Sequence, residues 1–80
     1  MKKNQSINNK ILKHLGLNIK YFRKKLNLTQ EQVAERIDAE RSYITALENG
    51  LKSSSIYFLC KLAHSLNTSL KELLDINLDI

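Results

Sequence analysis

The chain has 80 residues, of which 42% are hydrophobic, and its formal net charge is +5. This length supports one small domain, and a single cysteine excludes an internal disulfide and a cysteine-built zinc cluster. No apolar run approaches the length of a membrane span, and the basic start lacks the apolar segment of a signal peptide. We therefore expect a cytoplasmic protein that has no membrane partner.

Positive charge is concentrated in the first third of the chain. Residues 1–28 carry eight lysines and arginines and no acid, whereas the remaining residues carry five basic and eight acidic side chains. A segment with this much positive charge and no acid favours a polyanionic partner such as nucleic acid. A solvated basic tail is the competing interpretation, and we predict that residues 1–10 form a flexible basic tail.

Two helices are predicted first, over residues 11–26 and 29–37. The first shows apolar residues at helical spacing, which are Leu15, Ile19, Phe22 and Leu26. Gly16 lies within this stretch and is expected to weaken its early turn. The second opens with Thr29 as N-cap and Gln32 three residues later, which is the pattern of a capping box. It is expected to bury Val33, Ala34 and Ile37.

The next two helices are predicted over residues 41–49 and 55–66. The first of these buries Ile44 and Leu47, and Gly50 follows it at the position that favours a left-handed stop. The other shows an apolar stripe of Ile56, Leu59, Cys60, Ala63 and Leu66. Cys60 is therefore expected to be a small core residue, and Asn67 is expected to end the helix in a left-handed conformation.

A fifth helix is predicted over residues 69–74, where Ser69 and Glu72 form a second capping-box pattern. The whole chain has two glycines and no proline, which argues against a β-rich fold because such folds need more turn residues. The predicted fold class is all-α, a compact five-helix bundle.

The link between the second and third helices spans only residues 38–40. So short a link favours a steep crossing of the two helices, the helix-turn-helix arrangement, and the small Ala34 permits their close approach. Four residues are expected to face outward on the third helix, namely Arg41, Ser42, Thr45 and Ala46. These residue types contact base edges in the major groove of DNA.

The segments "LGLNIKYFRKKLNLTQEQVAERI", "RSYITALENG" and "SLNTSLKELL" resemble the phage-repressor type of helix-turn-helix domain, the Cro-like or Xre family. The resemblance covers residues 15–74. It implies a lambda-repressor-like DNA-binding domain, here placed over residues 11–75, that binds a double-stranded operator as a transcription regulator. No cofactor is expected, and no small-molecule ligand is evident from the sequence.

The same resemblance implies roles for individual residues. Base contacts fall on the four outward residues of the third helix. Phosphate contacts fall on Gln30, Asn49, Lys52 and Ser53. A phosphate contact is also predicted for Tyr43, apart from the resemblance. For Tyr43, packing at the rim of the core and a bond to a partner subunit are alternatives. Arg23 and Glu48 match a structural ion pair between the first and third helices.

Three positions depart from the family pattern. Asp38 replaces the usual glycine of the turn, Glu40 replaces the usual Ser or Thr cap, and Ser54 replaces a common proline. We expect the turn to survive, because aspartate tolerates left-handed conformations. The phrase "ERSYIT" also resembles controller proteins of restriction–modification systems, which are small dimers.

A dimer is expected because one recognition helix covers too few base pairs to select a site. The predicted dimer interface uses the fifth helix and an apolar tail over residues 76–80, and comprises Leu70, Leu73, Ile76, Leu78 and Ile80. Alternatively, this tail folds back on its own core.

Catalytic and metal-binding motifs are not found in the sequence, so we expect neither an enzyme nor a metalloprotein. His14 and His64 lack companions at ligand spacing and are interpreted as surface or boundary residues. The alternative to DNA binding is an antitoxin-like or anti-repressor module that uses the same fold to bind another protein. The acidic residues Asp38 and Glu40 favour this alternative, whereas the basic first third favours DNA.

Overall fold

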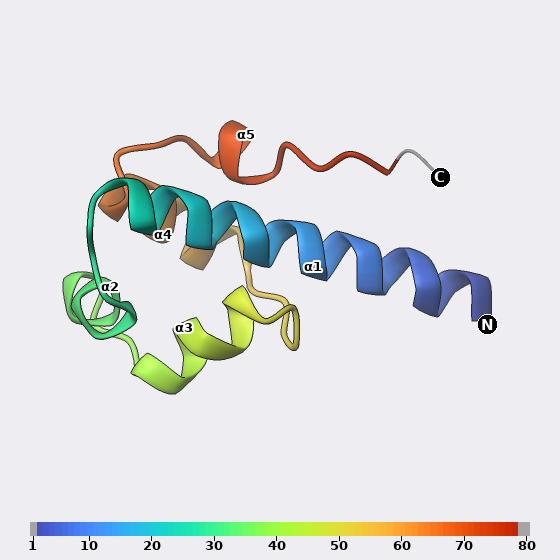
Figure 1. Ribbon diagram of the computed structural model, residues 1–80, viewed down its shortest axis with the longest axis horizontal. Helices are drawn as coiled ribbons and strands as arrows, with labels where there is room; N and C mark the ends of the chain where they lie inside the picture. The colour runs from blue at the N-terminus through green and yellow to red at the C-terminus, as the bar shows by residue number, and fades with distance from the viewer. Residues whose placement is uncertain (1, 79–80) are drawn as a thin grey trace.

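The computed structural model describes residues 2–78, with side chains from residue 7 onward. In this range the chain forms five helices and no strand, so the predicted all-α class is confirmed (Figure 1). The helices are α1 (Lys2–Lys25), α2 (Gln30–Arg36), α3 (Arg41–Glu48), α4 (Ile56–Ser65) and α5 (Leu70–Leu73).

Helix α1 is much longer than predicted. It begins at Lys2 rather than near residue 11, and its 24 residues span about 36 Å at about 1.5 Å per residue. That length accounts for the longest dimension of the molecule, 37 Å. The predicted start followed the apolar stripe, but residues 2–10 contain no glycine or proline that would end the helix. The flexibility proposed for residues 1–10 stays a prediction.

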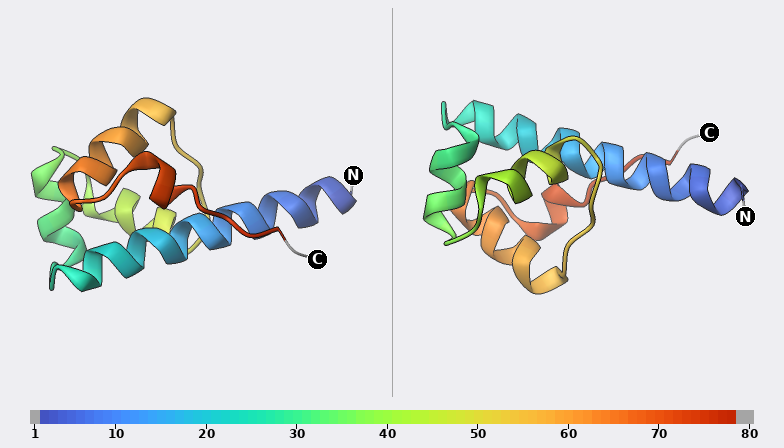
Figure 2. Two further views of the ribbon diagram at one scale, coloured as in Figure 1. Left: turned by 90° about the horizontal axis from the view of Figure 1, so that it is seen from above. Right: turned by 90° about the horizontal axis from the view of Figure 1, so that it is seen from below.

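One apolar core joins all five helices. Its fully buried side chains are Ile19, Val33, Ile44, Leu47, Leu62, Leu66 and Leu73. Helix α1 crosses the molecule on one side of this core, and α3 lies below α1 in Figure 1 (Figures 1 and 2). The core thereby fixes α3 against both α1 and α2 and leaves its other face turned outward.

Helices α1 and α3 pack closely against each other at Gly16. A Cβ atom at this position would lie 2.5 Å from the carbonyl oxygens of Leu47 and Glu48. Real side chains do not tolerate such distances to backbone atoms. Glycine does lower helix propensity by about 1 kcal/mol, as expected, but here it also permits direct packing of one helix on the end of the other.

The predicted helix ends are largely present. Asp38, Asn67 and Gly50 have positive φ angles of 57°, 56° and 72°. The capping box of α2 has both of its hydrogen bonds, whereas Glu40 makes no side-chain cap at the start of α3. In α5 the Ser69 side chain accepts from the amide of Glu72, but the Glu72 carboxylate accepts from the hydroxyl of Thr68, so the predicted second box is only half formed.

Helix α4 is rotated relative to the prediction. It buries Leu59, Leu62 and Ala63, while Cys60 is exposed and Ile56 is 59% exposed. The prediction that Cys60 belongs to the core is therefore wrong. The helix offers two overlapping apolar stripes, and packing against the other helices selects the one that contains Leu62.

The C-terminal segment folds back on α1. The Asn18 side-chain amide donates to the carbonyl oxygens of Leu73 and Asp75 at 3.0 and 3.1 Å. Leu73 is fully buried, and Leu70 and Ile76 pack against the core, so these residues serve their own subunit. The prediction that Leu73 contacts a partner subunit is therefore wrong, because its side chain is fully buried in its own subunit. Leu78 stays exposed, and Ile80 lies outside the described residues.

Candidate nucleic-acid interface

Helix α3 presents a polar face on the outer edge of the molecule. Arg41 and Ser42 are exposed, and Thr45 and Ala46 are partly exposed. No other part of the described chain lies below this helix in Figure 1. All four residues predicted to contact bases therefore lie on one accessible surface, the outer face of α3.

The turn between α2 and α3 is tight and well bonded. The amide of Ala39 donates to the carbonyl oxygen of Ala34 at 2.9 Å, which ties the turn to the middle of α2. Asp38 adopts the left-handed conformation that glycine often supplies. The unusual residue is thus accommodated without loss of the turn, as expected.

A buried ion pair anchors α3 to α1. Nε of Arg23 lies 2.6 Å from Oε2 of Glu48, and Nη2 of Arg23 lies 3.0 Å from Oε1, which makes a bidentate pair. Nη1 donates to the carbonyl oxygen of Leu28 at 2.8 Å, so the guanidinium also holds the chain before α2. The predicted pair is present. Such a pair orients helices more than it adds net stability.

Gln30 extends this network to the exposed face of α3. Its amide nitrogen donates to Oε1 of Glu48 at 3.0 Å, and its amide oxygen accepts from the hydroxyl of Thr45 at 2.6 Å. Both ends of the side chain are thus engaged by α3. A phosphate contact from Gln30 stays a prediction, and its donor would be the second proton of the amide nitrogen, since the bond to Glu48 uses only one of the two.

Tyr43 holds the loop between α3 and α4. Its hydroxyl donates to Oγ of Ser54 at 2.9 Å and lies 3.4 Å from the carbonyl oxygen of Ser53. Its ring meets Phe58 edge to face at a centroid distance of 5.0 Å, and Nζ of Lys52 lies 5.7 Å from the ring centre. These contacts favour the packing role of Tyr43. Its hydroxyl has one proton, which it already donates to Ser54 and would have to donate to a phosphate instead.

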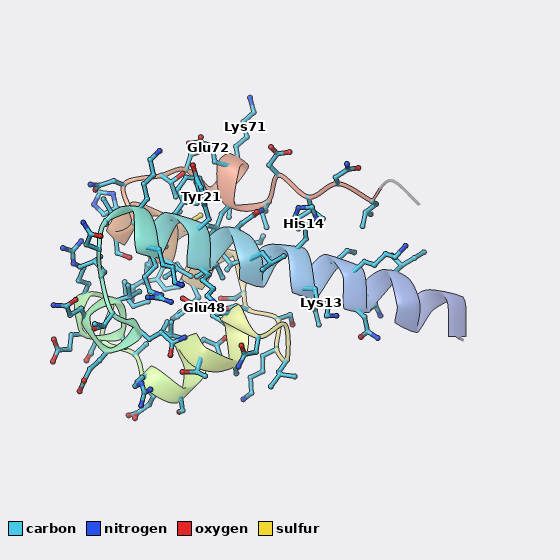
Figure 3. The ribbon with its side chains drawn as sticks, viewed as in Figure 1. Lys13, His14, Tyr21, Glu48, Lys71 and Glu72 are labelled. Carbon is cyan, nitrogen blue, oxygen red and sulfur yellow. The ribbon has the colours of Figure 1, made fainter. Side chains whose placement is uncertain are left out.

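The basic end of this surface includes a residue that the sequence did not single out. Asn49, Lys52 and Ser53, for which phosphate contacts are predicted, are exposed after α3. The backbone of Lys13 lies against Gly50, where an added Cβ would come within 3.0 Å of the Lys13 Cα. Lys13 points to the side of α1 on which α3 lies (Figure 3). The available signal was the run of lysines without acids, but it did not indicate which lysine adjoins the recognition helix.

Other kinds of site are not assembled in the described part of the chain. Between residues 2 and 78, no three His, Cys, Asp or Glu side chains converge as metal ligands would. In the same range no helix combines the length and the apolar character needed to cross a membrane.

A tight turn between two short helices, with the second helix presenting a polar face, defines a helix-turn-helix domain. The chain belongs to the helix-turn-helix family HTH_3, whose model matches residues 19–73. The predicted family resemblance is therefore confirmed.

This chain is similar to bacterial control and regulator proteins, some of which have solved structures. The control protein C.MunI of Mycoplasma is 38% identical over 66 residues, which cover 81% of this chain and 89% of the relative. The restriction–modification controller C.AhdI of Aeromonas hydrophila matches with a TM-score of 0.75 and 31% identity, over 78% of this chain and 94% of that one. SinR, a master regulator for biofilm formation, was solved in complex with DNA. It matches with a TM-score of 0.73 and 34% identity, over 76% of this chain and 98% of that one.

Proposed function

We propose that this chain is a sequence-specific, double-stranded-DNA-binding transcriptional regulator and not an enzyme. In this proposal α3 lies in the major groove of an operator. The protein is located in the cytoplasm. The observation that carries the proposal is the exposed polar face of α3, held in place by the Arg23–Glu48 pair and the tight turn. Short polar side chains on a rigid helix suit the approach to base edges.

The relatives favour a more specific role. C.AhdI is a restriction–modification controller protein, C.MunI is a control protein, and SinR was solved on DNA. We extend the controller role to this chain as part of the proposal. The exposed Asp38 and Glu40 favour the alternative of a protein-binding module, since they place negative charge at the start of α3.

The proposed operator complex contains a homodimer, and α4 supplies part of its interface. Ile56 and Tyr57 are 59% and 75% exposed at the start of this helix, and the exposed Cys60 follows one turn later. Exposed apolar groups of this size favour a protein partner. A second copy would bury them and bring two recognition helices to two half-sites.

Phosphate contacts at the basic end complete the proposal. Asn49, Lys52 and Ser53 follow α3 directly, and Lys13 joins them from α1. Phosphate contacts position a protein on the duplex and depend strongly on salt.

Selection of bound sequences from random duplex DNA tests the proposal. The wild-type protein should enrich one two-fold symmetric sequence. Arg41→Ala should reduce discrimination between operator variants by about 5- to 150-fold, which corresponds to about 1–3 kcal/mol for one base contact. Lys71→Ala is the control, because it removes one positive charge from an exposed position on α5, away from α3 (Figure 3). The absence of any enriched sequence would contradict the proposal.

A further inference from the structure

We propose that Thr45 contacts DNA through its methyl group, against the C5-methyl of a thymine, and that its hydroxyl donates no hydrogen bond to a base. This inference rests on the proposed function and specifies which chemical feature of the operator this residue recognises. It follows from the hydrogen-bond network that links α1, α2 and α3.

The polarity of the network is set at its buried end. The Arg23 guanidinium can only donate, so the Glu48 carboxylate accepts from it at 2.6 and 3.0 Å. The same carboxylate can only accept from Gln30, whose amide nitrogen lies 3.0 Å from Oε1. The orientation of the Gln30 amide is therefore determined, and its oxygen must point to Thr45.

The Thr45 hydroxyl is thus required to be a donor. It lies 2.6 Å from the Gln30 amide oxygen and 3.1 Å from the carbonyl oxygen of Arg41, and both partners are acceptors. A hydroxyl has one proton, so none is left for a base acceptor such as guanine O6 or thymine O4. Withdrawing the proton would leave the Gln30 amide oxygen without this partner, at the end of a buried charged network.

The methyl group of Thr45 is the remaining recognition feature. The methyl and the hydroxyl leave the same Cβ in different directions, and the hydroxyl is turned toward α2. Ala46, also partly exposed, places a second methyl beside it, and both residues lie one turn beyond the exposed Ser42. Apolar contact with the thymine methyl distinguishes this base in the major groove.

The test uses an operator obtained by selection and two variants that separate the groups on Cβ. Each thymine of a half-site is replaced in turn by uracil, which removes only the C5-methyl. For the wild type, one such replacement should weaken binding about fourfold, the value expected for one lost methyl contact. Thr45→Val keeps a methyl and should retain this uracil effect, whereas Thr45→Ser loses the methyl and should abolish it.

The opposite pattern would overturn the inference. If Thr45→Ser retained the full uracil effect, another residue and not the Thr45 methyl would contact the thymine methyl. A selected half-site without a methyl-dependent thymine would also overturn it, while the proposed function would stand because a sequence was selected. If no sequence were enriched at all, the proposed function itself would fail. Thermal unfolding of both variants checks that their folds are intact.

Discussion

Helices α3 and α4 both bury apolar residues on their inner faces, but their outer faces differ in polarity. Each buries apolar residues, for example Leu47 in α3 and Leu62 in α4. Outside, α3 presents the polar residues Arg41 and Ser42, whereas α4 begins with exposed apolar residues. The difference indicates two kinds of partner, because polar side chains suit base edges and phosphates, and exposed apolar groups suit another protein surface.

The inner side of α3 should be the most sensitive to substitution. Glu48→Ala leaves the Arg23 guanidinium buried without its carboxylate, and removing one partner of such a pair destabilises by about 3–5 kcal/mol. Chemical denaturation should show this loss in the free energy of unfolding. Glu31→Ala, at an exposed position on α2, is the control and should change it by less than about 0.5 kcal/mol.

A second pair of substitutions sharpens this prediction. Replacing both Arg23 and Glu48 by leucine should recover much of the stability, because the buried charges are removed together. A loss for the double variant as large as that for Glu48→Ala would contradict the desolvation argument.

The outer side of α4 can be tested by charge. Ile56→Glu with Tyr57→Glu should prevent dimer formation with little effect on folding, since both positions are exposed. Affinity for a two-half-site operator should fall by about 100-fold or more, because the second half-site no longer adds avidity. Affinity for a single half-site should stay within about twofold.

The mass of the protein in solution reports dimer formation, and titrations with operator DNA measure the two affinities. Lys71→Glu, an exposed change on α5, is the matched control. A double-glutamate variant that remains dimeric would exclude α4 from the interface and leave the exposed residues of the C-terminal segment as the candidates.

Gly16→Ala tests the packing of α1 on α3. The added methyl would meet two backbone carbonyl oxygens at 2.5 Å, so one helix must shift. Overpacking of this kind costs about 1–3 kcal/mol, although alanine itself favours the helix. Thermal unfolding should therefore show destabilisation. Leu17→Ala alters the next, exposed residue as a control, and an equal or larger loss there would refute the close-packing role of Gly16.

Lys13→Ala should have the smallest effect. A lost phosphate contact should weaken all duplexes by a similar small factor and reduce the slope of log affinity against log salt by about 0.9. Binding titrations at several salt concentrations measure this slope. Lys71→Ala, at an exposed position on α5, should leave the slope unchanged, and identical slopes for the wild type and Lys13→Ala would remove Lys13 from the interface.

The sequence predicted local features better than long-range ones. The capping box of α2, the left-handed stops and the turn at Asp38 depend on neighbouring residues and are present in the structure, and the capping box of α5 is half formed. The exposure of Cys60 was missed because α4 has two overlapping apolar stripes, and only the other helices select between them. Gly16 was interpreted from propensity alone, since nothing near it in sequence indicates contact with the end of α3.

The candidate site shows the same division. Periodicity was sufficient to place Arg41, Ser42, Thr45 and Ala46 on one face of the recognition helix. It did not show that the hydroxyl of Thr45 is bonded to Gln30, because these residues are brought together only by the turn. Hydrogen-bond direction requires coordinates, and it changes what Thr45 can recognise.

The most direct test of the central claim is an NMR titration of the protein with its selected operator. If the outer face of α3 contacts the bases, backbone amide shifts should be largest over residues 41–46 and 49–53 and small over α5. Shifts concentrated on α4 or α5, with residues 41–46 unchanged at saturation, would contradict the claim.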